Sequence, residues 1–351
     1  MEKFYCMLFI VTILLLLGNT KQFHAFRKIN YFLVCIILIL FSGFRYTPWG
    51  DYATYMIGFD HYKSSGLFSG EVIGSVIIAH LTSLISDDYA LWFFVYSFFT
   101  IGLITYTIYK HSVNYEYSIL LFILMGMWHV SFNIVKQYAA IAILFYAQDF
   151  IINKQFKRWV LACLVAACFH ISALLMIPVY FLLISKVSLK KIILYIFIGI
   201  ILYVSYQVLF DTMTFLKQGE AVTTMDSAVG ERSVNVLRIM VNCVPALLYT
   251  YMKYMKVGKQ IAENSEIDML ANFSFITAVI SLVSMNSVYL ARFYAYTDIF
   301  STLLYPYILS RFSRGIKIVF GIVILICYFI FWSFDLTKGD FAADFDWIFN
   351  R

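Results

Sequence analysis

The sequence predicts an all-α fold: a polytopic membrane helix bundle of about ten full spans plus two hairpins. Hydrophobic residues fill 62% of the 351 positions and charged residues only 13%, which is outside the range of a soluble domain. The apolar runs are roughly 15 to 25 residues long, as helices that cross a bilayer require. They lack strict alternation, which argues against barrel strands. Residues 1–351 are therefore expected to form a single integral membrane domain.

Ten apolar runs are expected to be full spans, because a chain in lipid must satisfy its backbone hydrogen bonds within its own helices. In chain order they are residues 4–18, 29–43, 89–109, 117–135, 137–152, 192–210, 233–252, 267–285, 293–310 and 316–333. The first run lacks a small-residue cleavage site and leads through a basic loop into another span. It is therefore not expected to be a cleaved signal peptide.

Two further apolar stretches do not fit simple crossings. Residues 71–86 are short and contain polar groups, whereas residues 159–184 are long and broken near His170 and Pro178. Both are expected to be re-entrant or interfacial hairpins. The total is then ten to twelve membrane helices.

The distribution of basic residues supports this topology. If neither hairpin crosses, six loops face the cytoplasm and hold 16 of the 26 Lys and Arg residues, as the positive-inside rule requires. These loops are residues 18–28, 110–116, 153–158, 185–191, 253–260 and 311–317. Both termini then lie outside. Making 71–86 a span, alone or together with 159–184, would move the basic loop at 153–158 outside, against the rule.

Three sizeable segments are expected on the outer side. The last is an acidic tail after the final span, with Asp335, Asp340, Asp344 and Asp346. Residues 44–70 include a predicted interfacial helix, Asp51 to Tyr62, whose apolar residues recur at i, i+3, i+4 and i+7 and are expected to rest on the bilayer. Residues 211–232 are charged and long, and they are expected to act as a mobile lid.

Five basic residues fall on the predicted outer side, where such residues are scarce: Arg45, Lys136, Arg232, Arg238 and Arg292. A cation at the mouth of apolar helices needs an anionic partner, which points to a phosphate site. Local alternatives stay open for two of them, because Arg45 could pair with Asp51 and Arg292 with Asp298. Arg232 and Arg238 do not share a helix face closely and are expected to serve different partners.

His170 is a candidate general base, since an imidazole titrates near neutral pH and the hairpin would place it at the outer mouth. A structural role for this histidine is equally open. The sequence contains no HExxH metal motif and no GxxxxGK[ST] phosphate loop, so no cofactor, metal or nucleic acid is expected. Basic and aromatic side chains remain, and they suit a lipid diphosphate that carries sugars.

Three segments carry a recognisable pattern of basic, polar and aromatic residues. They are FSGFRYTPWGDYATYMIGF, then NIVKQYAAIAILFYAQDFIINKQFKRWVLACLVAACFHISALLMIPVYFLL, and later YLARFYAY. Together they resemble the EpsG family. The resemblance runs across nearly the whole chain. It implies a Wzy-like polysaccharide polymerase of the bacterial plasma membrane, related in fold to the GT-C glycosyltransferases and the O-antigen ligases.

The family pattern marks nine residues: Arg45, Asp51, Tyr52, Tyr55, Lys136, Gln137, His170, Ser172 and Arg292. Tyr52, Tyr55, Gln137 and Ser172 are the expected substrate-binding residues, with Tyr296 beside Arg292. The chain departs from the family at one position, where a basic-Gln pair that is commonly Arg-Gln begins with Lys136. Lysine holds a phosphate as a point charge but cannot form the bidentate fork.

The expected reaction moves a growing glycan from undecaprenyl diphosphate to the non-reducing end of a lipid-linked repeat unit. The diphosphate leaves, so cations replace a metal, and either His170 or Asp51 takes the acceptor proton with inversion. Expected partners are the lipid-linked oligosaccharide, membrane lipid, a chain-length regulator and a flippase. Three other classes stay open: a flippase, an O-antigen ligase or membrane acyltransferase, and a non-enzymatic scaffold. The sequence leaves open whether the polymer would be a capsule, an exopolysaccharide or an O-antigen.

Overall fold

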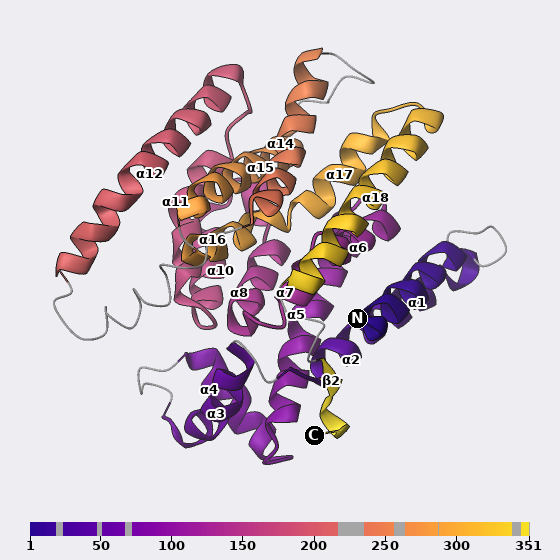
Figure 1. The fold of residues 1–351 in the computed structure, drawn as a ribbon, viewed down its shortest axis with the longest axis vertical. Helices are drawn as coiled ribbons and strands as arrows, with labels where there is room; N and C mark the ends of the chain where they lie inside the picture. Colours follow the sequence, from indigo (N-terminus) through magenta and orange to yellow (C-terminus); the bar gives the residue numbers. More distant parts are fainter. Residues whose placement is uncertain are drawn as a thin grey trace. The chain divides into compact units, whose positions relative to one another are not determined.

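The computed structural model describes residues 1–18, 24–47, 51–66, 72–216, 235–255, 264–286, 288–338 and 345–350. This part of the chain is almost entirely helical, as predicted (Figure 1). Four of its helices are long and apolar enough to cross a membrane: Tyr89–His111, Val135–Ile152, Ser265–Val283 and Arg314–Thr337. The chain is therefore an all-α membrane protein, and the number of its spans stays a prediction.

Most helices fall on the predicted spans and hairpins. The α-helices are α1 Glu2–Gly18, α2 Arg27–Gly43, α3 Asp51–Ser64, α4 Ile73–Ser83, α5 Tyr89–His111, α6 Tyr115–Leu124, α7 Met127–Val130, α8 Val135–Tyr146, α9 Asp149–Ile152, α10 Phe156–Ala167, α11 Met176–Leu183, α12 Leu189–Leu216, α14 Val236–Met255, α15 Ser265–Val283, α16 Val288–Asp298, α17 Ser301–Ser310 and α18 Arg314–Lys338. The 3-10 helices are η1 His24–Phe26, η2 Ile171–Leu175, η3 Ser284–Asn286 and η4 Ile348–Asn350. Strands β1 Arg45–Tyr46 and β2 Asp346–Trp347 pair antiparallel.

Three predicted spans are interrupted, which the sequence did not indicate. Residues 117–135 divide into α6 and α7, residues 137–152 into α8 and α9, and residues 293–310 into α16 and α17. Between α6 and α7, Gly126 has a φ of 88°, a conformation that glycine adopts without strain. The expectation of unbroken spans is wrong for these three.

The chain divides into two compact units. Unit 1 holds residues 1–150, 156–177 and 318–351, and unit 2 holds residues 151–155 and 178–317. Both units are helical. The prediction of one integral membrane domain is not decided by this division.

Contacts within unit 1 bring together the loops that the sequence places on the same side. At one end, Arg27 pairs with Glu116 at 2.9 Å and Lys110 with Asp149 at 2.5 Å. These pairs join two loops predicted to be cytoplasmic, 18–28 and 110–116, to each other and to the end of the predicted span 137–152. The common location of these loops at one end agrees with the topology, and the side of the membrane they face stays a prediction.

At the opposite end of unit 1 the two ends of the chain meet. Lys3 pairs with Asp346 at 2.7 Å, and Asp346 lies in β2, which pairs with β1 after α2. The hydrogen bond from Lys3 lowers the pKa of the Asp346 carboxyl to about 2. The pair therefore stays ionised above that pH, and it is lost as the pH falls through this value. N-terminal and C-terminal residues share one side, as predicted.

Helix α3 confirms the predicted helix in the first outer segment, but its aromatic face is not free for the bilayer. Tyr52, Tyr55, Phe59 and Tyr62 are all buried, in a cluster that includes Trp92 and other residues of α5. Tyr52 lies flat on Phe93, with ring centroids 4.2 Å apart. Helices α3 and α4 lie side by side (Figure 1). The periodicity identified the buried face correctly, whereas the expected partner, lipid, is replaced by protein.

The predicted hairpin at residues 159–184 forms around His170. Helix α10 has 12 residues and spans about 18 Å, which is too short for a hydrocarbon core of about 30 Å. The indole of Trp159 donates a hydrogen bond to the carbonyl of Met176 at 2.9 Å, so the chain reverses between them. His170 lies at the reversal. Pro178 is in the first turn of α11, where proline is tolerated, so only the break near His170 is confirmed.

The start of α4 touches this hairpin backbone to backbone. The amide of Gly74 donates to the carbonyl of Cys168 at 2.7 Å. A Cβ at position 74 would lie 2.7 Å from the ring of Phe169, so the approach requires glycine. The segment 71–86 is therefore packed against the hairpin through α4, an 11-residue helix.

A contact between an imidazole and a carboxylate joins α7 to α18 within unit 1. The imidazole Nε2 of His129 lies 2.8 Å from a carboxylate oxygen of Asp335, and the side chains are 0% and 17% exposed. Removing the Asp335 carboxylate leaves the fully buried imidazole of His129 without this hydrogen-bond partner.

We expect Asp335→Asn to destabilise the purified protein by about 3 kcal/mol, because the buried imidazole loses its carboxylate. Asp346→Asn is the control, since the pair that Asp346 forms with Lys3 is exposed and contributes little. Thermal unfolding in detergent measures both. Equal melting temperatures for the two variants would contradict this role of Asp335.

Candidate functional site

Arg45 lies in a closed cage at one end of unit 1. Its side chain is 1% exposed, and its guanidinium donates hydrogen bonds to the carbonyl of Ser42 and, at 2.7 Å, to that of Phe132. The same group lies 4.8 Å from the ring of Phe132, 5.1 Å from Phe93 and 5.4 Å from Tyr52. The hydroxyl of Tyr52 also donates a hydrogen bond to the backbone carbonyl of Arg45.

This geometry decides between the two readings of Arg45. The guanidinium of Arg45 donates hydrogen bonds to backbone carbonyls and lies against aromatic rings. Arg45 therefore does not form the local ion pair with Asp51 that the sequence left open. Burial lowers the pKa of Arg45 to about 10, which leaves it charged at neutral pH. Arg45 fixes the aromatic cluster, and its Nε has no hydrogen-bond partner.

Lys136 is the most informative cation of unit 1. It is half-buried at the start of α8, where its ammonium donates to the hydroxyl of Tyr62 at 2.9 Å. The ammonium also lies 5.1 Å from the rings of both Tyr55 and Tyr62. Among the described residues, the hydrogen bond and the ring contacts of the Lys136 ammonium are all to tyrosine side chains. A half-buried cation compensated by aromatic groups alone can attract an anion from outside.

Asp51 joins the same region through the segment before α8. Its backbone amide, at the first residue of α3, donates to the side chain of Asn133 at 2.9 Å. Asn133 precedes Lys136 by three residues. Gln137 follows Lys136 and is 2% exposed. The structure therefore brings Arg45, Asp51, Tyr52, Tyr55 and Lys136 to one end of unit 1.

His170 and Ser172 form a pair at the hairpin tip. The Nδ1 atom of His170 lies 2.6 Å from the hydroxyl of Ser172, and the histidine is half-buried. Because α4 contacts both the tip and α3, this pair lies at the same end of unit 1 as Lys136.

The other predicted residues lie in unit 2 or outside the described residues. Arg292 is half-buried in α16, and Tyr296 on the same helix is 2% exposed. The cation that acts on buried Asp298 is Arg238 of α14, rather than Arg292 as the sequence alternative proposed. Arg232 and most of the expected lid fall outside the described residues, while α12 extends the preceding span to Leu216. Convergence of all five cations on one site stays a prediction.

Sequence reasoning missed two features of this region. Tyr62 continues the spacing of Tyr52, Tyr55 and Phe59 by another turn, so the helical period already marked it. Asp335 was assigned to an acidic tail because the last span was ended at residue 333. Helix α18 continues to Lys338, and Asp335 pairs with His129 instead.

Among the described residues, no three His, Cys, Asp or Glu side chains lie close enough together to hold a metal ion. The spacing DxD does occur near the C-terminus as Asp344, Phe345 and Asp346. Asp346 is engaged by Lys3, and Asp344 lies outside the described residues.

We expect Lys136→Gln to weaken binding of inorganic pyrophosphate about tenfold, because the cation without an acidic partner is lost. Lys63→Gln is the matched control on the adjacent helix, where Asp60 and Asp87 already neutralise the ammonium at 3.0 and 3.2 Å. Isothermal titration of the purified protein measures both affinities. Equal losses in the two variants would rule out a specific anion site at Lys136.

Comparison with known proteins adds one match. No curated protein and no solved structure matches the chain. The model of the EpsG family matches residues 28–345, which include every site residue named above. Since this match covers most of the sequence, the chain belongs to the EpsG family, a family of Wzy-like polysaccharide polymerases.

Proposed function

We propose that this protein transfers a growing glycan from undecaprenyl diphosphate to the non-reducing end of a lipid-linked repeat unit, on the outer face of the bacterial plasma membrane. The observation that supports it best is Lys136, a half-buried ammonium held by Tyr55 and Tyr62. A phosphate group supplies the anion that this site lacks, and tyrosine rings suit sugar faces.

The proposed reaction depends mainly on neutralising the negative charge of the leaving diphosphate. Diphosphate is a good leaving group, and its departure places negative charge on the bridging oxygen. Arg292 and Lys136, with Arg238 and Arg232, are proposed to stabilise this charge, which makes the reaction independent of metals. Arg45 is proposed to act through the same anion, after an opening that exposes its unpaired Nε. Tyr52, Tyr55, Gln137, Ser172 and Tyr296 are proposed to hold the sugars.

The acceptor hydroxyl must lose a proton as it attacks. His170 and Asp51 are the two candidate bases, and each lies at the same end of unit 1 as Lys136. Ser172 lies 2.6 Å from Nδ1 of His170 and is proposed to orient the imidazole. A single displacement inverts the anomeric carbon. A GT-C-like arrangement and partners such as a flippase and a chain-length regulator belong to the same proposal.

We expect Arg292→Ala to abolish polymer in cells while single lipid-linked repeats accumulate, because the leaving diphosphate is no longer neutralised. Arg158→Ala is the control, an exposed arginine at the start of α10 in the hairpin. Gel analysis of the polymer and mass spectrometry of the lipid fraction give the two readouts. Normal polymer length in Arg292→Ala would refute the assignment.

One base is expected to carry the proton transfer. The two variants to compare are His170→Gln and Asp51→Asn. The variant that lacks the true base should turn over about 100-fold more slowly or worse, and its pH–rate profile should lose one limb. The variant that keeps the true base should retain both limbs of the profile. A polymerase assay with a purified lipid-linked repeat, run from pH 5 to pH 9, distinguishes them. Full turnover in both variants would exclude both candidate bases.

A flippase for the same lipid-linked unit is the second candidate, and the interrupted spans favour it. Transporters often bind substrate where helices break, and three predicted spans of this chain are broken. The two functions differ in product. A flippase variant lacks outward-facing lipid-linked repeats, whereas a polymerase variant accumulates them.

A further inference from the structure

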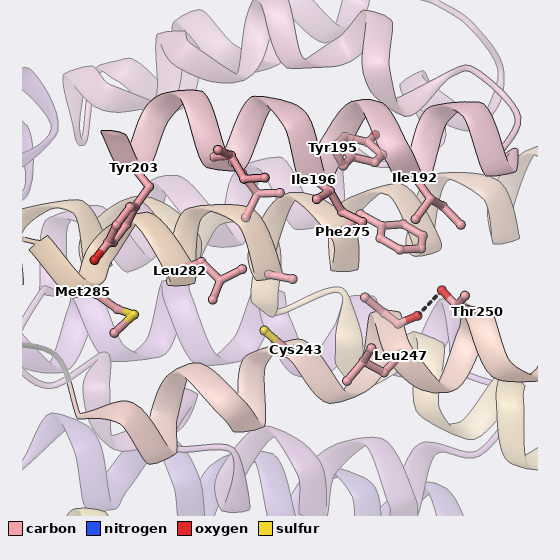
Figure 2. A pocket seen from close by; sticks show the side chains of 15 residues that line it. Ile192, Tyr195, Ile196, Tyr203, Cys243, Leu247, Thr250, Phe275, Leu282 and Met285 are labelled. Carbon is pink, nitrogen blue, oxygen red and sulfur yellow. Dashed lines mark hydrogen bonds between the residues drawn. The ribbon is translucent and has the colours of Figure 1, made fainter. Parts of the chain in front are cut away.

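Unit 2 contains an apolar groove that the proposed reaction has not used. It lies between α12, α14 and α15 and has a volume of about 580 Å³ (Figure 2). Pockets that hold small molecules usually measure about 300 to 1,000 Å³. Fifteen residues line it, and Figure 2 shows Ile192 and Thr250 at one end and Tyr203 and Met285 at the other.

The groove offers almost nothing to a polar ligand. The hydroxyl of Thr250 donates to the carbonyl of Ala246 at 2.7 Å, and the hydroxyl of Tyr195 donates to Asn272 at 3.0 Å. The remaining walls are mostly aliphatic, from residues such as Ile196, Ile200, Leu247 and Leu282. The groove therefore suits an apolar occupant such as a hydrocarbon chain.

The surroundings of the groove identify the source of that chain. Large apolar side chains stand exposed beside it, among them Ile193, Phe197 and Val204 on α12 and Met240 on α14. In a membrane protein such a surface faces lipid. The groove is thus open to the bilayer, and lipid tails can enter it from the side.

The dimensions fit a chain that lies along the helices. From Ile192 to Tyr203, α12 rises about 17 Å, which is close to the depth of about 15 Å of one leaflet of hydrocarbon. Small residues make the room: Gly199 and Ala278 line the groove, and a Cβ at Gly199 would only touch Val279.

The two ends of the groove differ in charge. Beside Ile192, the ammonium groups of Lys191 and Lys253 already donate to backbone carbonyls. At the other end, Asn242 of α14 donates to Ser281 of α15, and Arg238 lies one turn of α14 further on. Arg292 lies on α16, which follows Met285 through η3 and packs back along α15. A diphosphate at this second end would approach Arg238 and the N-terminus of α14, with Arg292 on the neighbouring helix.

We propose that this groove binds the isoprenoid tail of the lipid diphosphate substrate, with the diphosphate at the end near Arg238 and Arg292. The inference rests on the proposed function, which supplies a polyprenyl substrate. It adds a tail-binding site on α12, α14 and α15 that positions the diphosphate relative to the cations.

Photocrosslinking tests the site directly. The full-length protein is placed in lipid nanodiscs with a benzophenone-bearing polyprenyl diphosphate, irradiated, and mapped by peptide mass spectrometry. We expect label on the groove residues of α12, α14 and α15. Label confined to other helices overturns the proposal. Equal label in the groove from a photoreactive phosphatidylglycerol also overturns it, because the groove would then hold bulk lipid.

Filling the groove gives an independent readout. Leu247→Trp adds bulk at the groove, and Met240→Trp adds the same bulk to an exposed position of α14 outside it. On α12, Gly199→Leu fills the groove, and Ile201→Phe is its control at an exposed position outside the groove. The groove variants should lower groove labelling by the polyprenyl probe about tenfold, and the controls should not. Unchanged labelling in both groove variants overturns the proposal.

The outcomes also separate this inference from the polymerase assignment. If cells with the native protein make polymer while the groove stays unlabelled, the tail site is wrong and the polymerase stands. If lipid-linked repeats are processed identically with and without the protein, the polymerase is wrong, whatever the label shows.

Discussion

The burial of the Arg45 guanidinium is the interaction on which one end of unit 1 depends. The charge is held by carbonyls in the last turn of α2 and between α7 and α8, and by aromatic rings from α3 and α5. Four segments far apart in the sequence thus converge on one side chain. A guanidinium suits this position because it keeps its charge, presents several donors in a plane and stacks on aromatic faces.

This arrangement gives the two cations of unit 1 different roles. The guanidinium of Arg45 donates hydrogen bonds to carbonyls of the protein itself. The carbonyl of Arg45 accepts a hydrogen bond from Tyr52 at the start of α3. Lys136 lies across the same aromatic cluster, where its contacts are to tyrosines. Arg45 contacts Tyr52 and Phe93, which belong to the same buried cluster as the Tyr55 and Tyr62 that contact Lys136. Arg45 therefore packs against this cluster in the structure, and its contact with the diphosphate stays a proposal.

Much of the fold was readable from the sequence, because apolar length and loop charge are strong constraints in a membrane. The helices fall on the ten predicted runs, and the hairpin turns at His170. The breaks were not readable, since Gly126 in a helical pattern does not by itself reveal a left-handed turn. The partner of the α3 aromatic face was also hidden, because lipid and a protein core select the same side chains.

The site was predictable only in part. Residue types and spacing identified Lys136, Asp51 and His170 as chemistry-bearing, and the structure groups them at one end of unit 1. The pairing of His129 with Asp335 joins residues 206 positions apart, and no local pattern carries that information. Arg238 acts on Asp298 for the same reason, across two helices rather than along one.

The close approach of Gly74 to Cys168 has a consequence for motion. Main-chain atoms meet there, so no rotation of a side chain can separate α4 from the hairpin tip. Any rearrangement of the tip that keeps this hydrogen bond also moves the first turn of α4. The surroundings of His170 are thereby coupled to α4 and, through it, to α3.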